Sequence, residues 1–494
     1  MKIRILDENR LEIVVFLCGA VVMIIELVGS RVVAPYFGNS LVVWTSLIGV
    51  ILGSLSAGYY FGGKIADRFR SFETLGILIM CASALTGLGA FFKEPVLAYV
   101  SLLFGSELRA ASFVAALVLF GPVSFVLGIV SPYSAKLKLI NLNSTGRVVG
   151  NLSALSTLGS ICGTFLAGYF LIPWVGNSKL LYILALVLLG ISFLAVSRPT
   201  TVDRAFRTRF QLGLLIIFFF ILNQIMGIFK ISSLADIDSM YSRIIVKSVR
   251  SGTSPLLTMS TDHSGIQSAI NLQSPDELVF EYTKAYAQFD KINPKIKKAL
   301  MIGGGGYSFP RYFLLHNHEA SIDVVEIDPM MTMLARKYFH LEVDSRMLIF
   351  HQDARSFIRN SNKKYDVIFL DAFSSLTPPP HLTTKEFMED LNTSLTDEGF
   401  LMINLISAVD GDNARFLKSE RATLLTIFPK VDVYTLGELP LTQTQNLLVV
   451  AYKKSVGDYL ALGKMVQETE PGNGQVLTDD WSPVEYMTRN YYLR

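Results

Sequence analysis

The fold is decided by ALMIGGGG (Ala299–Gly306) and IDVVEIDP (Ile322–Pro329), two short apolar segments that end in glycines and in acidic residues. Two stretches of the same kind follow them, MLIFHQDA (Met347–Ala354) and YDVIFLDAF (Tyr365–Phe373). Helix-forming sequence separates these segments. Strands that alternate with helices predict a parallel, doubly wound sheet, in which ligands bind at the carboxyl ends of the strands.

Glycines and a pair of carboxylates end the first two predicted strands. Gly303, Gly304 and Gly305 would let a ligand approach the backbone closely, because they carry no side chain. Glu326 and Asp328 end the second strand. Glu326 follows the glycines by about 20 residues, a spacing that suits a carboxylate accepting hydrogen bonds from ribose hydroxyls. These residues predict the ribose side of a nucleoside site.

The next two predicted strands also end in carboxylates. Asp353 ends the third strand and is placed to accept a hydrogen bond from an adenine amine, while Asp371 ends the fourth. The carboxyl ends of parallel strands meet at one crevice, so these side chains should lie close together. The six histidines show no metal-ligand spacing, and we expect no metal. The pattern predicts a nucleoside site built of hydrogen-bond acceptors.

A smaller β-structure is expected before the doubly wound domain. Three short, β-branched stretches bounded by turn residues predict a meander: Tyr241–Val249, Leu256–Asp262 and Ile266–Ile270. A helix over Asp276–Phe289 would follow, with Ser274 and Pro275 at its start. We therefore assign residues 231–292 to a small β-meander domain with a connecting helix, and residues 293–494 to the doubly wound domain.

The first half of the chain is far more apolar. Hydrophobic residues make up 51% of the 494 residues and charged residues 17%, which excludes a disordered chain and a nucleic-acid-binding tail. Apolar runs long enough to span a bilayer begin near seven positions: Leu11, Leu41, Leu75, Ala111, Gly150, Leu180 and Leu212. Residues 1–230 are therefore predicted to form a transmembrane domain of about seven helices. Pro95–Phe104 is too short to span the bilayer alone and is predicted to be an interfacial or re-entrant segment.

Several motifs in the second half of the chain resemble those of a known family. The stretch from Tyr241 to Tyr452 resembles the spermidine synthases, or polyamine aminopropyltransferases. The motifs that carry the resemblance are GGGG, VEIDP (Val325–Pro329), DAR (Asp353–Arg355) and YDVIFLDAF. With the apolar half included, the chain resembles bacterial and archaeal membrane proteins that fuse such a domain to a multi-span region. ELVGSRVVAPYFG (Glu26–Gly38) and LTDDWSPVE (Leu477–Glu485) fit that fused group.

The resemblance implies a Rossmann-like fold of the S-adenosylmethionine-methyltransferase type and an aminopropyl transfer. Decarboxylated S-adenosylmethionine would donate the aminopropyl group to a diamine, as a co-substrate and not a prosthetic group. Glu326 would bind the ribose, Asp353 and Ala354 the adenine, and Asp371 would accept the proton. Such a carboxylate can orient and deprotonate an ammonium before the amine attacks the carbon next to a sulfonium.

The chain departs from the family pattern on the diamine side. The aspartate that follows the three glycines in the family is Gly306 here, and the second carboxylate of its Asp-Ser-Ser-Asp motif is Ser374. Where the family has a glutamine after an early tyrosine, this chain has Ser242. Where the family has a Tyr-His or Tyr-Gln pair, this chain has Phe280–Glu281. Glu281 is a candidate to replace one missing carboxylate, and both Glu281 and Ser374 are predicted to contact substrate.

Two other functions stay open beside the aminopropyltransferase. One is an S-adenosylmethionine-dependent methyltransferase on the same fold, and the other is a transporter or sensor whose soluble domain binds a nucleoside or polyamine without turnover. Asp371 favours the aminopropyltransferase, whereas the missing carboxylates at Gly306 and Ser374 favour the other two. The expected partners are a small diamine or polyamine and the lipid bilayer, with no nucleic acid. A homodimer through the soluble domain is compatible with these features.

The charge distribution bears on membrane sidedness. Residues 1–230 carry 18 Lys and Arg against nine Asp and Glu, and the rest carry 26 against 32. Basic residues occupy alternate loops, which places those loops in the cytoplasm and, after seven spans, the soluble half outside. An adenosyl donor is made in the cytosol, which argues for the opposite. We expect a multi-pass cell-membrane protein and favour a cytoplasmic catalytic domain with one segment that does not span the membrane.

Overall fold

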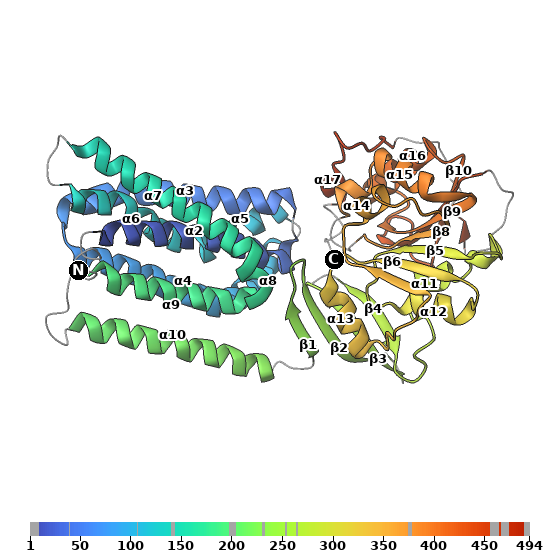
Figure 1. Cartoon of the computed structure of the whole chain (residues 1–494), viewed down its shortest axis with the longest axis horizontal. Coiled ribbons are helices and arrows are strands. Elements are labelled where there is room, and N and C mark those ends of the chain that lie inside the picture. Colours follow the sequence, from blue (N-terminus) through green and yellow to red (C-terminus); the bar gives the residue numbers. More distant parts are fainter. Residues whose placement is uncertain are drawn as a thin grey trace. The chain divides into compact units, whose positions relative to one another are not determined.

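The computed structural model divides into two compact units, Met1–Ile231 and Ser232–Arg494 (Figure 1). The structure describes residues 9–38, 40–105, 107–139, 144–196, 204–229, 233–251, 254–262, 265–373, 378–454, 464–465 and 474–488.

The first unit is entirely helical in the part that is described. Its helices are α2 (Arg10–Phe37), α3 (Leu41–Arg68), α4 (Phe72–Phe104), α5 (Leu108–Leu119), α6 (Gly121–Lys138), α7 (Thr145–Leu166), α8 (Ile172–Val175), α9 (Asn177–Ala195) and α10 (Arg204–Phe229), with a π-helical turn at Ala167–Leu171. Among the described residues, six helices are long and apolar enough to cross a membrane, or seven if α5 and α6, bent by 53°, count as one. The expectation of a separate Pro95–Phe104 piece is wrong, because these residues continue α4.

Close helix contacts hold this unit together. A Cβ atom at Gly58 of α3 would overlap the carbonyl oxygen of Phe125 in α6, and one at Gly159 of α7 would overlap the carbonyl oxygen of Phe16 in α2. Only glycine allows two backbones to approach so closely. The small residues of the apolar runs therefore set which helices pair.

Contacts at both ends show the direction of the bent pair α5–α6. Near its start, Ser112 Oγ lies 2.9 Å from Ser46 Oγ at the start of α3. Near its end, Lys136 Nζ lies 2.6 Å from Asp67 Oδ1 at the end of α3. The pair therefore runs parallel to α3 over nearly all of that helix.

The helices α9 and α10 both pack along α4. Lys93 Nζ lies 2.5 Å from Ser178 Oγ near the start of α9, and Ser83 Oγ donates a hydrogen bond to the Ala185 carbonyl further on, so α9 runs antiparallel to α4. Helix α10 runs parallel to α4, because Arg209 packs against Gly76 and the Phe219 ring lies 4.7 Å from that of Phe91.

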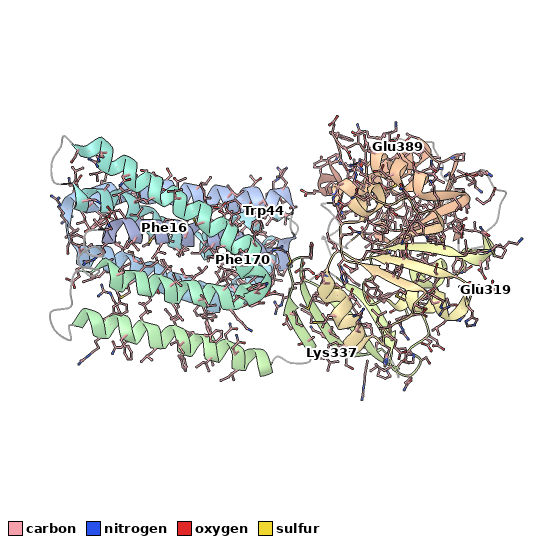
Figure 2. All side chains as sticks on the ribbon, in the orientation of Figure 1. Phe16, Trp44, Phe170, Glu319, Lys337 and Glu389 are labelled. Atoms are coloured by element: carbon pink, nitrogen blue, oxygen red, sulfur yellow. The ribbon has the colours of Figure 1, made fainter. Side chains whose placement is uncertain are left out.

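The outward-facing side chains of the two units differ (Figure 2). In the first unit, large apolar side chains face outward, including Phe170 at 49% exposure and Trp174 at 80%. In the second unit, the labelled charged residues Glu319, Lys337 and Glu389 are exposed. An exposed apolar surface of this extent is typical of a surface that contacts a membrane or another protein.

The second unit begins with a four-stranded antiparallel sheet in the order β1-β2-β3-β4. The strands are β1 (Ser233–Asp238), β2 (Arg243–Ser251), β3 (Ser254–Thr261) and β4 (Ile266–Asn271). The last three correspond to the expected meander, and β1 is an additional strand. The following helix is shorter than expected: α11 covers only Glu281–Tyr286, and a 3₁₀ turn covers Phe289–Lys291.

An eight-stranded sheet follows, in the order β12-β10-β11-β9-β8-β5-β6-β7. Its strands are β5 (Lys298–Ile302), β6 (Ser321–Val325), β7 (Met347–Phe350), β8 (Tyr365–Leu370), β9 (Leu395–Ser407), β10 (Lys430–Thr435), β11 (Gln445–Tyr452) and β12 (Lys464–Met465). Strands β5 to β9 are parallel in the order 3-2-1-4-5 of a Rossmann-like sheet, whose switch point lies between β5 and β8.

The sheet is mixed, so the expectation of a wholly parallel sheet is wrong at one end. Strand β11 is antiparallel to both β9 and β10. The connection from β10 to β11, residues 436–444, is too short for the crossover that parallel strands need, so the two strands form a hairpin.

Helices cover both faces of the large sheet (Figure 1): α12 (Ser308–His316), α13 (Pro329–Tyr338), α14 (Ala354–Arg359), α15 (Lys385–Ser394), α16 (Arg415–Leu425) and α17 (Val484–Thr488). Successive side chains of β5 enter two different cores, as the period of a strand requires. Met301 packs with Phe313 of α12, whereas Leu300 and Ile302 pack with Phe387 of α15. In the described part of the chain the sheet is buried on both faces, which leaves its strand ends as the place for a ligand.

Candidate active site

A cavity of about 690 Å³ lies at the carboxyl ends of the parallel strands. The residues that follow β5, β6, β7 and β8 line it, together with part of β4, α11 and the β10–β11 connection. The cavity includes the switch point between β5 and β8, where Rossmann-like sheets bind their ligands.

The glycine turn after β5 is shaped by backbone demands. Gly303 and Gly305 have positive φ angles of +92° and +52°, which favour glycine. A Cβ atom at Gly303 would overlap the carbonyl oxygen of Asp371, so the turn and the end of β8 lie in backbone contact. The predicted glycines therefore bring the first and fourth strand ends together.

Glu326 is buried and fixes the glycine turn. Its Oε2 accepts hydrogen bonds from the amides of Gly304 and Gly305, at 2.9 and 3.1 Å, and its Oε1 accepts one from the Asp328 amide at 3.0 Å. Burial raises the pKa of Glu326 in spite of these three bonds, and nearby Asp328 adds to the rise. Oε1 keeps a further lone pair for a ligand hydroxyl.

Asp328 lines the cavity, but its carboxylate is engaged within the protein. Oδ1 accepts from the Met330 amide at 2.9 Å and so caps α13. Oδ2 accepts from Ser239 Oγ, in the turn after β1, at 2.5 Å. These contacts give Asp328 a structural role beside any contact with a ligand.

Asp353 caps α14, and Ala354 beside it also lines the cavity. Oδ1 of Asp353 accepts from the Ser356 amide at 2.9 Å, and Oδ2 lies 3.0 Å from His381 Nε2. Burial alone would raise the pKa of Asp353, but the bonds from Ser356 and His381 bring it below the ordinary value. Asp353 is therefore a carboxylate at neutral pH, and its oxygens act as hydrogen-bond acceptors.

Asp371 lies beside the glycine turn at the switch point. Its Oδ1 accepts from Asn404 Nδ2 at 2.9 Å, and Tyr282 also donates to it. Desolvation by burial raises the pKa of Asp371 to about 7, although the bonds from Asn404 and Tyr282 lower it, and Glu326 contributes to the rise. A carboxylate with this pKa can accept and release a proton near neutral pH.

Sequence reasoning missed Tyr282, Asn404, Asn446 and His381. Asn404 carried a usable signal, because it is a lone amide within the apolar strand β9, and a buried amide needs hydrogen-bond partners. It bonds to Asp371 and accepts from Asn446 Nδ2 at 2.9 Å. The other three residues stand in sequence surroundings that carry no comparable signal.

Two further residues, Glu281 and Ser374, are predicted to contact substrate. Glu281 lines the cavity, but its side chain is 65% exposed and lies 2.7 Å from Lys284 Nζ. Ser374 lies outside the described residues.

The cavity is acidic. Among its described lining residues, five are carboxylates and none is Lys or Arg, so the site attracts cations. No group of three or more His, Cys, Asp or Glu side chains in the described part of the chain is arranged to hold a metal ion.

Comparison with known proteins places these motifs in a family. The spermine/spermidine synthase domain matches residues 280–436. The chain is 32% identical over 161 residues to a polyamine aminopropyltransferase of Vibrio vulnificus, which covers 32% of this chain and 52% of that protein. It is 31% identical over 208 residues to the Chromobacterium violaceum polyamine aminopropyltransferase, covering 42% and 76%. For the first of these and several other relatives, the chain spans about half of their length.

Among solved structures, a probable spermidine synthase from Corynebacterium glutamicum is 25% identical, with a TM-score of 0.40, covering 45% of this chain and 80% of that one. The family assignment rests on the sequence relatives, since the match to the Chromobacterium protein extends over three quarters of its length. The chain therefore belongs, through its second unit, to the spermine/spermidine synthase family of polyamine aminopropyltransferases.

Proposed function

We propose that the second unit transfers an aminopropyl group from decarboxylated S-adenosylmethionine to an amine acceptor. The observation that carries this proposal is Asp371, a carboxylate at the switch point with a pKa raised to about 7. The sequence relatives support it, because those described above are named polyamine aminopropyltransferases.

The chemistry requires a base at this place. An amine acceptor is an ammonium ion at neutral pH and must lose a proton before its nitrogen can attack. Asp371 would take that proton. The nitrogen then forms a bond to the propyl carbon next to the sulfonium, and the carbon–sulfur bond breaks with its electron pair passing to sulfur. Asn404 and Tyr282 would hold the Asp371 carboxylate in place during the transfer.

The nucleoside would bind on the β5–β6–β7 side of the cavity. Glu326 Oε1 would accept from a ribose hydroxyl, and Asp353, with Ala354 beside it, would accept from the adenine amine. Gly303, Gly304 and Gly305 would leave room for the sulfonium end next to Asp371.

A methyltransferase is the second candidate, and one observation favours it. Position 306, an aspartate in the family pattern, has no side chain here, and a Cβ atom there would lie 2.8 Å from Ser268 Cβ. Ser268 Oγ instead accepts from the Gly306 amide at 2.8 Å. The amino-acid tail of the donor would lie beside the Ser268 hydroxyl, where the family pattern has a carboxylate. A hydroxyl does not repel the carboxylate of intact S-adenosylmethionine, so the experiment must compare the intact and the decarboxylated donor.

The deciding experiment uses the purified full chain in lipid nanodiscs. Intact and decarboxylated S-adenosylmethionine are each supplied with a panel of amines, and the nucleoside product is identified by mass spectrometry. Aminopropyl transfer leaves methylthioadenosine, whereas methyl transfer leaves S-adenosylhomocysteine. Methylthioadenosine without an aminopropylated amine would be hydrolysis and would count against the proposal. Binding without any product would favour a sensor or transporter.

We further propose that the first unit is embedded in a lipid bilayer as a multi-pass domain. Its helices of 26 to 33 residues are long enough to cross, and their outward side chains are apolar. Because α5–α6 runs beside nearly all of α3, we count this pair as a crossing rather than a re-entrant loop. Seven crossings bring the end of α10 to the face opposite the basic loops, which by the charge rule is the non-cytoplasmic face.

This sidedness differs from the cytoplasmic placement favoured on donor chemistry, and labelling tests it. A cysteine replaces Asn362, which is exposed between α14 and β8, in a chain in which Cys18, Cys81 and Cys162 are replaced. Labelling of intact cells by a membrane-impermeant maleimide is expected. Protection until lysis would place the second unit in the cytoplasm.

A further inference from the structure

The order of strands divides the cavity into two sides about Asp371. Strands β5, β6 and β7 lie on one side of β8, and β9, β11 and β10 lie on the other. The nucleoside-side carboxylates Glu326, Asp328 and Asp353 all follow β6 and β7. If the nucleoside occupies that side, the acceptor extends from Asp371 toward β9, β11 and β10, which we call the acceptor side.

The acceptor side is neutral among the described residues. The strands and connections there contribute Asn404, Ile406, Leu436, Leu439, Thr444 and Asn446 to the lining. Glu438, in the same β10–β11 connection, is exposed and does not line the cavity.

Glu281 does not supply the missing charge. Its carboxylate lies 2.7 Å from Lys284 Nζ and the side chain is 65% exposed, so its charge is balanced and screened by water. Apart from Asp371, which the mechanism uses as the base, the described acceptor side therefore holds no buried carboxylate for a second ammonium.

The hydrogen bonds fix what the acceptor side presents instead. An ionised Asp371 can only accept, so Asn404 turns its NH₂ group toward it and its Oδ1 toward Asn446. Asn446 then donates from Nδ2 and leaves its Oδ1 as a neutral acceptor. Asn446 Oδ1 can bind a hydroxyl or amide N–H, whereas an ammonium placed there would lose hydration without a compensating charge.

We propose that the acceptor is a primary amine whose far end is uncharged, an amino alcohol or a simple monoamine, and not a diamine. This inference rests on the proposed aminopropyl transfer and narrows its acceptor. It follows from the neutral lining that the described residues of β9, β11 and the β10–β11 connection provide, beside Asp371, which can act on only one nitrogen.

The test compares three acceptors of equal chain length with decarboxylated S-adenosylmethionine: 4-aminobutan-1-ol, 1-aminobutane and 1,4-diaminobutane. We expect kcat/KM for the amino alcohol to exceed that for the diamine by about tenfold or more, because the second ammonium would be desolvated without a partner. A wild-type preference for the diamine would overturn the inference and leave aminopropyl transfer standing. Transfer to none of a broad amine panel would reject the proposed function itself.

A matched pair of variants tests whether the missing carboxylate causes the preference for an acceptor with an uncharged far end. Leu439 lines the cavity and is 47% exposed, whereas Leu441, in the same connection, is 50% exposed and does not line it. Leu439→Glu should raise the ratio of kcat/KM for the diamine to that for the amino alcohol by about threefold or more, because a partly exposed ion pair contributes an effect of this size. Leu441→Glu should leave the ratio unchanged. Equal ratios in a folded Leu439→Glu protein and in Leu441→Glu would contradict the role given to the missing charge.

Discussion

Arg355 of α14 and Asp479 near the chain's end form a two-point ion pair, with Nη1 2.7 Å from Oδ1 and Nη2 2.6 Å from Oδ2. This pair joins the DAR motif to LTDDWSPVE. Thr384 Oγ1 donates to the same Asp479 at 2.8 Å, and Arg355 Nη1 donates to the His381 carbonyl at 3.3 Å. The C-terminal segment therefore holds the loop that brings His381 to Asp353.

Loss of this ion pair should weaken donor binding without disturbing chemistry. Asp479→Asn removes the charge that fixes Arg355 and the His381 loop, so we expect the KM for the adenosyl donor to rise about fivefold, equivalent to about 1 kcal/mol, with kcat little changed. Steady-state kinetics measures both. Asp480→Asn is the control, because Asp480 is adjacent and exposed. A fall in kcat at constant KM would show that Asp479 does not act through the donor site.

Asp371→Asn should abolish the proton acceptor while keeping its shape. The amide oxygen can still accept from Asn404, but it cannot take a proton, so turnover should fall by about two to four orders of magnitude. Calorimetry should find donor affinity nearly unchanged, since the nucleoside contacts lie on other strands. Wild-type turnover in this variant would remove Asp371 from the mechanism.

The pH dependence follows from the raised pKa of Asp371. The base works only when ionised, and burial raises its pKa to about 7, so kcat/KM should fall as the pH drops below about 7 and level off above it. The bond from Asn404 lowers this pKa, so Asn404→Leu should move the acidic limb upward by about one pH unit. The pH profiles of kcat/KM for the wild-type and the Asn404→Leu proteins, recorded at saturating donor, measure this shift. An acidic limb that moved to lower pH in Asn404→Leu would contradict the assignment of Asp371 as the base.

Glu326→Gln should weaken both the glycine turn and ribose binding. The amide keeps one acceptor oxygen for the three amide N–H groups that Glu326 now satisfies, and it loses the charge that strengthens them. We expect adenosyl affinity to fall by about 1–3 kcal/mol in calorimetry, with a lower melting temperature. Unchanged affinity despite a lower melting temperature would confine Glu326 to a structural role.

The parallel strands and the residues at their ends could be predicted from the amino-acid sequence alone. Alternation of short apolar segments with helices fixed β5 to β8, because that pattern is local and each strand must be buried on both faces. The same logic placed Gly303, Glu326, Asp353 and Asp371 at one cavity, since parallel strand ends converge. Apolar runs likewise predicted the long helices of the first unit, apart from the continuation of α4 through Pro95.

How these residues affect one another depends on contacts that form only in the folded chain. The pKa of Asp371 depends on burial and on Asn404, a residue from another strand. The Arg355–Asp479 pair joins positions 124 residues apart, and the insertion of β11 between β9 and β10 sets the neutral acceptor side. Side-chain periodicity reports on neighbours along the chain. Desolvation, ion pairing and strand insertion arise between segments that meet only after folding, so no local pattern encodes them.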